Sequence, residues 1–349
     1  MLPLYLSLDD VLLLPQHSYI NSRSEVDLSW NLGEISLTFP LITVNMDCVT
    51  GVEMAIAMGK LGGLSIMPRF DAPEVQAEKI KKVKEAGVPV AAAIGIKDEE
   101  LTRAKLLVAA GVDHLSLDVA HGHLEKTLIM LKKVRKEFPK ISLSAGVVGT
   151  YQGAKDLFKA GADIVRVGVG PGTICTTRIA TGCGVPQFTA IQECARAARE
   201  LKKIIWADGG TKNSGDIVKC LAAGASAVCA GSLFAGATES PSKIVKINGK
   251  KYKVYNASTC ATEKKKQYKK YLDDKKPEYL KHVEGVESLV PFKGSVSEIV
   301  DNLLAGIKSG YSYNNAKTTP EIWENAQFVR VTAVGLKENG AHDVLLQSP

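Results

Sequence analysis

A cysteine stands in the glycine-rich stretch GVGPGTICTTRIATGCG, residues 168–184. Most free cysteines are buried as small apolar side chains, but a segment with so many glycines has little core of its own. Arg178 and the free backbone N–H groups of such a loop favour the thiolate, the nucleophilic form of the side chain. We therefore predict that Cys175 is a nucleophile. Other cysteines are expected in the core or in loops: Cys183, Cys194, Cys220 and Cys229.

Two further glycine turns have the composition of a phosphate site. Asp208-Gly209-Gly210 precedes a predicted helix start near Ser214, and Gly231-Ser232 precedes Phe234. Backbone N–H groups at such turns bind phosphate without a side-chain cation. Either turn alone could be a tight strand–helix connection, but two at consecutive strand ends favour a phosphate. Asp208 is then placed to accept hydrogen bonds from ribose hydroxyls.

These candidates need elements that bring them together, and the apolar pattern indicates alternating strands and helices. Strands are predicted at 40–45, 62–67, 89–94, 113–118, 141–145, 163–168, 203–207 and 226–231. Helices are predicted at 73–86, 98–110, 124–138, 151–160, 189–201 and 214–223. Four of these helices end at a glycine suited to a left-handed cap: Gly87, Gly111, Gly161 and Gly224. We predict an α/β fold, a (β/α)8 TIM barrel, with a doubly wound parallel sheet as the alternative.

A barrel gathers the residues that follow its strand C-termini on one face, where active sites form. Polar or glycine-rich residues stand at most of these positions: Asn45, Asp47, Arg69, Asp118, His121, Gly168–Gly172, Cys175, Asp208–Gly210 and Gly231-Ser232. No GxGxxG opens a helix after the first strand, so a nicotinamide cofactor would not be held in the Rossmann manner. GVGPG looks similar, but we expect a cysteine loop and not a helix to follow it.

The charge of the chain is concentrated in one segment. Residues 250–281 contain eleven lysines and four acidic residues, against a net charge of +7 for the whole chain. This segment is a solvated loop, a nucleic-acid patch or a mobile flap over an anionic ligand. Because the rest of the chain is nearly neutral, we do not expect nucleic acid to be the main partner.

Several classes of protein are disfavoured by the composition. No apolar run approaches the ~20 residues that cross a bilayer, and residues 1–15 lack the basic region of a secretory signal. The seven cysteines form no CxxC pair, which favours a reducing cytoplasm over disulfides or a zinc site. His121 and His123 have no metal-ligand partners at suitable spacing, so we expect core or substrate-facing histidines.

The loop GVGPGTICTTRIATGCGVPQ resembles the signature loop of the IMP dehydrogenase/GMP reductase family, and ADGG (207–210), GSLFAG (231–236) and DVLLLP (10–15) fit it too. Residues 70–88 leave no room for the CBS modules that the dehydrogenases usually carry. SRSEVDL (22–28) and ECARAARELK (193–202) lean towards the reductases. The long segment from Tyr255 to Glu284, in which Lys270-Tyr271 could replace a flap Arg-Tyr pair, is dehydrogenase-like.

The resemblance implies one catalytic barrel over residues 1–349, with a lysine-rich flap at 240–295 after the eighth strand. It implies conversion of GMP to IMP and ammonia with NADPH through a thioimidate on the cysteine. The alternative within the family is oxidation of IMP to XMP with NAD. A homotetramer is implied as well. From other classes, a nucleotide- or RNA-binding relative without catalysis and a flavin-dependent barrel remain alternatives.

The resemblance also implies roles for particular residues. Thr177 and Glu284 would handle protons beside Cys175. The nucleotide would be bound by Asp208 at the ribose, by Gly209, Gly210, Gly231 and Ser232 at the phosphate, and by Ser258 and Glu284 at the base. Asp118 and Arg69 are expected at the nicotinamide cofactor. Carbonyls of Gly170, Gly172 and Cys175 would bind a monovalent cation, K⁺ by expectation. The chain departs from the family pattern at Val147, Asn256, Ala257 and Lys281.

Overall fold

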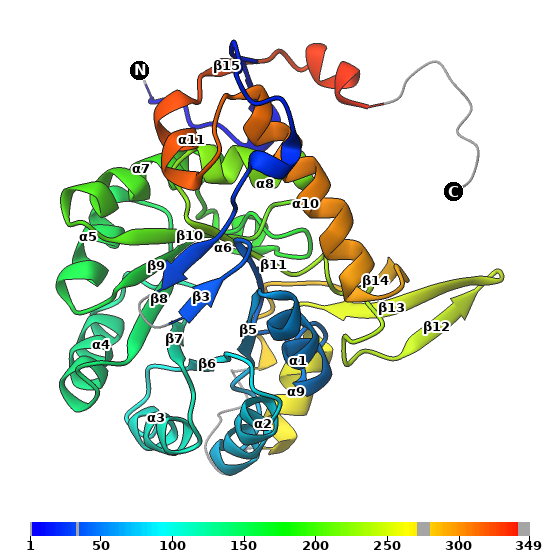
Figure 1. Cartoon of the computed structure of the whole chain (residues 1–349). Coiled ribbons are helices and arrows are strands. Elements are labelled where there is room, and N and C mark those ends of the chain that lie inside the picture. The colour runs from blue at the N-terminus through cyan, green and yellow to red at the C-terminus, as the bar shows by residue number, and fades with distance from the viewer. Residues whose placement is uncertain (1, 33–34, 271–279, 341–349) are drawn as a thin grey trace.

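The structure, a computed structural model, describes residues 2–32, 35–270 and 280–340. Eight parallel strands close into a barrel in the order β10-β11-β4-β5-β6-β7-β8-β9, and Figure 1 shows helices in a ring around them. Their bounds are β4 Leu41–Thr43, β5 Leu64–Met67, β6 Ala91–Ile94, β7 His114–Asp118, β8 Ser142–Val148, β9 Ile164–Val167, β10 Ile204–Asp208 and β11 Ala227–Ala230. The predicted (β/α)8 barrel is confirmed, and because the sheet closes on itself, the doubly wound alternative is wrong.

The helices between the strands follow the predicted segments closely. These are α2 Pro73–Glu85, α3 Glu100–Ala109, α4 Glu125–Glu137, α5 Tyr151–Lys159, α7 Gln187–Glu200 and α8 Ser214–Ala222. The predicted caps are present, because the glycines that follow α2, α3, α5 and α8 have φ of 72°, 86°, 116° and 118°. Two ring helices, α1 (Val52–Leu61) and α10 (Val296–Tyr313), were not predicted. Smaller helices are α6 Thr177–Thr181 and α11 Thr319–Asn325.

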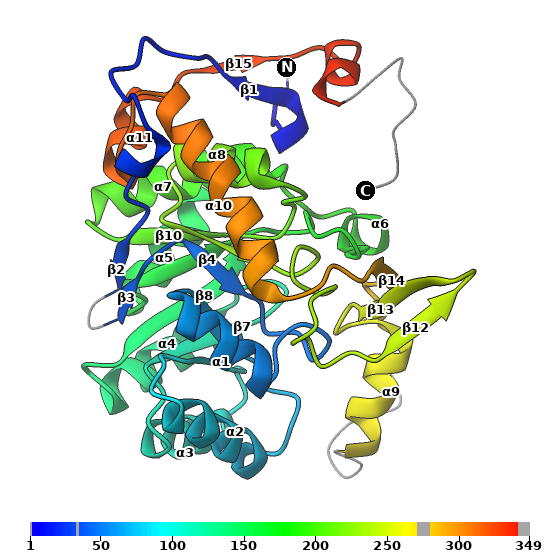
Figure 2. The same ribbon diagram turned by 45° about the vertical axis from the view of Figure 1, so that its right-hand side comes forward.

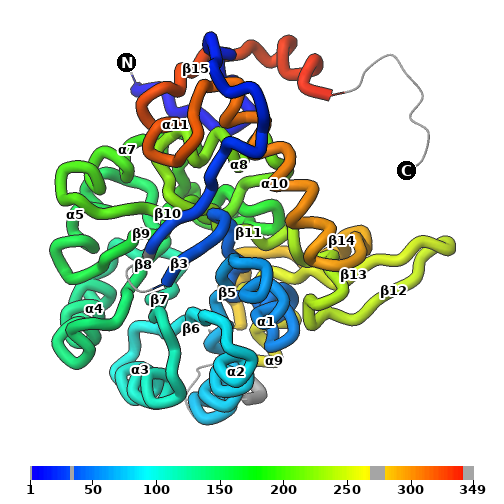
Figure 3. Tube along the Cα trace, viewed as in Figure 1, coloured from blue at the N-terminus to red at the C-terminus, as the bar shows by residue number. Residues whose placement is uncertain are grey.

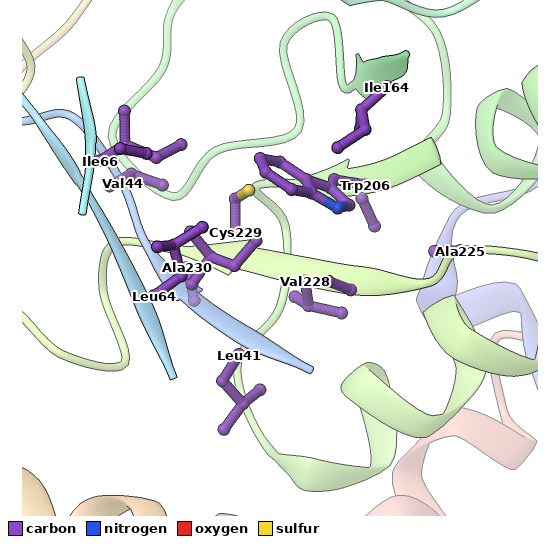
Figure 4. Packing of buried hydrophobic residues seen from close by; sticks show 14 of the residues in the cluster. Leu41, Val44, Leu64, Ile66, Ile164, Trp206, Ala225, Val228, Cys229 and Ala230 are labelled. Atoms are coloured by element: carbon purple, nitrogen blue, oxygen red, sulfur yellow. The ribbon is translucent and has the colours of Figure 1, made fainter. Parts of the chain in front are cut away.

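The barrel core combines apolar packing with a buried polar chain. Trp206 is fully buried, and Figure 4 shows its ring among side chains of neighbouring strands. Its ring lies 5.0 Å from that of His114, whose nitrogens contact the hydroxyls of Ser142 and Ser144, each at 2.8 Å. Burial lowers the pKa of His114 to about 3, so the imidazole is neutral and serves as a hydrogen-bonding group inside the barrel.

The segment between β11 and α10 forms a small layer of its own. Strands β12 (Ile244–Ile247), β13 (Lys250–Asn256) and β14 (Glu287–Pro291) make an antiparallel sheet in chain order, and α9 (Ala261–Lys270) follows β13. Figure 2 shows this flap on the same side of the barrel as α6. The sequence patterns did not predict these antiparallel strands, because β13 (KKYKVYN) carries three lysines and β12 and β14 are short, with four and five residues.

Not all of the flap lysines are solvated. Lys253 is 2% exposed, and its ammonium donates to the carbonyls of Thr238 and Ser240 at 2.9 and 2.7 Å. This lysine ties β13 to the connection that leaves β11, so a uniformly solvated loop does not describe the segment.

The two ends of the described chain meet beside the barrel. Strand β1 (Val11–Leu13) pairs antiparallel with β15 (Phe328–Arg330). Figure 2 labels the two strands next to each other, and the tube in Figure 3 shows the blue N-terminal and red C-terminal segments close together near the top. A hairpin of β2 (Trp30–Leu32) and β3 (Ile35–Leu37) precedes the first barrel strand. Short 3-10 turns are Leu8–Asp10, Arg23–Glu25 and Gly335–Asn339. Among the described residues, no helix combines the length and apolarity of a membrane span.

Candidate active site

The cysteine loop leaves β9 and turns tightly at the carboxyl end of the barrel. Gly168 lies so close to β10 that a Cβ there would be 2.0 Å from the carbonyl oxygen of Asp208; only glycine fits. The N–H of Cys175 donates to the Gly172 carbonyl at 3.1 Å, which folds the loop back and leaves the thiol half-buried. As expected, the cysteine loop and not a helix directly follows GVGPG, and the five-residue α6 starts only at Thr177, after the cysteine.

The thiol of Cys175 starts a chain of two hydrogen bonds. Its Sγ donates to the hydroxyl of Thr177 at 3.2 Å, and that hydroxyl donates to Oε2 of Glu284 at 2.8 Å. Each donor points in the same direction, so a proton can pass from sulfur through the hydroxyl to the carboxylate without rearrangement of heavy atoms. The Arg178 guanidinium, expected to favour the thiolate, donates to the carbonyl of Val185 at 2.7 Å.

Backbone pairing between the loop and the flap holds this chain together. Cys175 forms an antiparallel bridge with Gly285, made by the N–H of Thr176 to the Glu284 carbonyl at 3.2 Å and that of Val286 to the Ile174 carbonyl at 3.1 Å. A Cβ on Gly285 would lie 2.2 Å from Cβ of Ala257. Glycine is therefore required where the flap crosses the loop.

Asp208 ends β10 beside a buried arginine, Arg166, that was not predicted as a site residue. Nε and Nη2 of Arg166 both contact Oδ2 of Asp208, at 2.7 and 2.6 Å, so Oδ1 is not used by this pair. Nη1 contacts Asp118 at 3.1 Å, and Nη2 donates to Asn45 at 2.9 Å. Burial opposes the positive charge, but the two carboxylates outweigh it and raise the pKa of Arg166.

Arg166 thereby connects the ends of four barrel strands. It is 3% exposed and also donates to the Ser116 hydroxyl at 3.2 Å, which accepts from Ser144 at 2.8 Å in the chain that starts at His114. A buried guanidinium with this many partners is rigid. The signal for it in the sequence is a single charged residue inside the apolar strand IVRV, residues 164–167.

The two predicted phosphate turns lie side by side, since β10 and β11 are neighbours. Gly209 and Gly210 have φ of 79° and 86°, and a Cβ on Gly210 would touch Pro171 of the cysteine loop at 3.1 Å. The Tyr255 hydroxyl lies 2.7 Å from the position a Cβ would take on Gly231. Ser232 accepts from the hydroxyl of Thr173 at 3.5 Å. Both turns therefore contact the loop or the flap.

A further carboxylate lies on the opposite side of the barrel mouth. Asp118 ends β7, and Arg69, after β5, places Nε 3.8 Å from its Oδ2. This Nε is buried and has no hydrogen-bond partner among the described residues. Val147 lines the same side of the cavity with an apolar surface. The pair thus places a carboxylate acceptor, with a buried guanidinium nitrogen beside it, next to an apolar wall.

One cavity of about 240 Å³ joins most of these groups. Its predicted members are Gly170, Gly172, Cys175, Thr177, Asp118, Asp208, Gly209, Gly231, Ser258 and Glu284, and residues not predicted include Arg166, Tyr255 and Thr259. Gly210, Ser232 and Arg69 lie at its border and do not line it. Tyr271, of the proposed Lys270-Tyr271 pair, falls outside the described residues.

Other expected residues lie away from the cavity. The imidazole of His123 contacts Asp156 at 3.0 Å, and within the described ranges no cluster of histidine, cysteine and acidic side chains could hold a metal ion. Cys194, Cys220 and Cys229 are buried and Cys183 is exposed, as predicted for core and loop residues.

Comparison with known proteins gives consistent similarities. Residues 5–342 match the model of the IMP dehydrogenase / GMP reductase domain. An inosine-5'-monophosphate dehydrogenase of Nitrosopumilus maritimus is 33% identical over 471 aligned residues, covering 98% of this chain and of the relative. Because the alignment is longer than this chain, the relative carries a segment without a counterpart here. The Aquifex aeolicus enzyme of the same name is 44% identical over 292 residues, 82% of this chain and 58% of the relative.

A solved structure is similar over nearly the whole fold. A GMP reductase variant from Trypanosoma brucei, in complex with guanosine 5'-monophosphate, has a TM-score of 0.92 at 27% identity, with 99% of each chain covered. The barrel, the flap and the terminal segments of this chain therefore all have counterparts in that structure.

Proposed function

Since this chain belongs to the IMP dehydrogenase/GMP reductase family of purine nucleotide oxidoreductases, we propose that it reduces GMP to IMP and ammonia with NADPH, through a covalent intermediate on Cys175. The observation that carries the proposal is the donor chain from Cys175 through Thr177 to Glu284. It gives one site both a nucleophile and a proton carrier, the two functions that replacement of an amino group at a purine carbon requires.

The first step follows from the direction of the hydrogen bonds. The thiol proton moves through the Thr177 hydroxyl to the Glu284 carboxylate while sulfur bonds to C2 of guanine and the adjacent C=N bond opens. Protonated Glu284 then returns a proton to the exocyclic amine, which leaves as ammonia, and a thioimidate remains. Proton transfer of this kind contributes about 10²–10⁴-fold to the rate.

The second step needs a hydride, which NADPH supplies when bound. Hydride addition at C2 and cleavage of the C–S bond release IMP and restore the thiolate. Overall, GMP, NADPH and two protons give IMP, NADP⁺ and ammonium. The role of the chain is to hold the ring against the sulfur and to keep water away from the thioimidate.

The nucleotide would be oriented by the strand ends. Asp208 accepts hydrogen bonds from ribose hydroxyls, and Arg166 fixes its carboxylate for that purpose. The turns at Gly209-Gly210 and Gly231-Ser232 hold the phosphate through backbone N–H groups. Ser258 and Glu284 line the cavity and would bind the purine base.

The cofactor and cation assignments are also proposals. Asp118, which lines the cavity beside the apolar side chain of Val147, fits a nicotinamide riboside as a hydroxyl acceptor, and Arg69 would help to hold the Asp118 carboxylate. For a monovalent cation, the Gly172 carbonyl carries one hydrogen bond and keeps a second lone pair; Gly170 and Cys175 would supply the other carbonyls. Activity that rises with K⁺ and not with Li⁺ would support the site.

IMP dehydrogenase activity is the second candidate, favoured by the names of the curated relatives. It would need a base that activates water for attack on the thioimidate. In the expected flap pair Lys270-Tyr271 a lysine takes the place of the arginine, and a lysine lacks the planar fork of an arginine. Initial rates with GMP plus NADPH and with IMP plus NAD, followed at the nicotinamide absorbance, test both. Turnover with IMP plus NAD alone would overturn the reductase proposal, and turnover with neither would overturn both.

Two coarser properties complete the proposal. Seven free cysteines suit a reducing cytoplasm. A homotetramer follows from the resemblance, and light scattering of the purified protein measures the mass that decides it.

A further inference from the structure

Helix α9 contacts the site through two buried polar side chains. Of its side chains described here, residues 261–267, only Lys264 and Gln267 are buried, at 6% and 4% exposure. They are three residues apart and so share one face of the helix. Burying a lysine costs free energy unless its charge is compensated, so the contacts of this face are informative.

Each of the two side chains holds the backbone of a segment that lines the cavity. The Lys264 ammonium donates to the carbonyl of His282, two residues before Glu284. The Gln267 amide donates to the carbonyl of Ser258 at 3.0 Å. Glu284 and Ser258 are the two flap residues assigned above to the base, so the same helix face fixes both.

Among the described residues, the backbone of the Glu284 segment is also held along both of its edges. On one side, residues 284–286 pair with 174–176. On the other side they pair with 257–259: the N–H of Glu284 donates to the Thr259 carbonyl at 3.4 Å, and the N–H of Ala257 donates to the Val286 carbonyl at 3.1 Å. These bonds set the register of the segment. The chain that leads into this segment at His282 is positioned by the hydrogen bond from Lys264.

Lys264 also acts through its charge. Burial lowers the pKa of its ammonium, and the negative charge of Glu284 partly opposes that effect, which means that the two groups interact electrostatically. Lys265 and Lys266, on the same helix, are exposed.

We propose that Lys264 is a positioning residue for the reaction: it fixes the His282 carbonyl, and through it the Glu284 carboxylate, against Thr177, while Gln267 does the same for Ser258. The inference rests on the proposed function, because it holds that the buried face of α9 positions Glu284 for proton transfer from Cys175. A misplacement of about 1 Å at a reacting group can cost about 100-fold in rate.

The test compares matched substitutions in the intact protein. Lys264→Met is expected to lower kcat about ten- to a hundredfold with little change in the affinity for GMP measured by calorimetry. Lys264→Arg, which keeps the charge and donors, should recover most of that loss. Lys265→Met, the same change at the exposed neighbour, should leave kcat and KM at the wild-type values.

Gln267→Met provides a second measurement, with the main effect expected on KM for the nucleotide. If Lys264→Met does not fold, Gln267→Met carries the test, and a wild-type KM for the nucleotide in that variant would overturn the proposal. Equal kcat in Lys264→Met and Lys265→Met would overturn it too, while leaving the proposed function intact. A wild-type protein without turnover of either nucleotide pair would instead overturn the proposed function, and this inference with it.

Discussion

Replacing Thr177 by valine removes one oxygen from the centre of the proposed proton chain. The hydroxyl accepts from Cys175 at 3.2 Å and donates to Glu284 at 2.8 Å, and valine has nearly the same shape. The side chain is partly exposed at the start of α6. The substitution therefore interrupts proton transfer without opening a cavity in the core.

The magnitudes separate a catalytic from a structural effect. Loss of two hydrogen bonds costs about 0.5–1.5 kcal/mol each in stability, which a protein of ordinary stability, about 5–15 kcal/mol, tolerates. Loss of general acid–base catalysis costs about 10²–10⁴-fold in kcat, or roughly 3–5 kcal/mol of transition-state stabilisation. The catalytic loss should thus far exceed any loss of folded protein.

Steady-state rates with GMP and NADPH, together with thermal melting, measure both quantities. Thr176→Val is the matched control, because its contact with the flap is through the backbone N–H and survives the change. We expect Thr177→Val to lose at least about 100-fold in kcat while Thr176→Val stays close to wild type. Equal kcat in the two variants would refute the proton chain.

Three further predictions address the nucleophile, the flap and the core. Cys175→Ala should abolish turnover and keep nucleotide binding, whereas the exposed Cys183→Ala should keep both; rates and calorimetry check this. Gly285→Ala, whose Cβ would lie 2.2 Å from that of Ala257, should lower kcat far more than Gly335→Ala. His114, with a folded-state pKa of about 3, binds its proton only in the unfolded state between pH 3 and 6.5. The free energy of unfolding should therefore decrease as the pH is lowered through that window, by about 2 kcal/mol from pH 6.5 to pH 5. Denaturant titrations measure it, and His114→Gln should show a correspondingly smaller loss.

The barrel was predictable because its signals are local. Each buried parallel strand is a short apolar run, and a glycine in the left-handed region ends four of the helices. The rule that strand ends share one face then brought Cys175, Asp208 and Gly231 together without any knowledge of distances. Helix α1 was missed because VEMAIAMGKL is apolar on most sides, which gives a weak helical period.

The parts that sequence could not supply depend on contacts between distant segments. Arg166 looks like one residue of a strand until its four partners are placed around it. Glu284 entered only through the resemblance, since no spacing rule connects it with Thr177 across more than a hundred residues of chain. Lys264 is one of three consecutive lysines, and only packing shows that it alone of them is buried.

The order of the chemical steps bears on which of the two candidate reactions, reductive deamination of GMP or oxidation of IMP, the site favours. Reductive deamination needs its proton donor at the amine in the first step, before hydride transfer. An oxidation that ends in hydrolysis needs an activating base only after the hydride has left, at a position that water can reach. In this chain residues 284–286 are paired on both edges, and Lys264 donates to the carbonyl of His282 just before them, which together hold Glu284 beside the thiol. A proton carrier held in place from the start suits the deaminating step, so variants that loosen this segment should slow ammonia release more than hydride transfer.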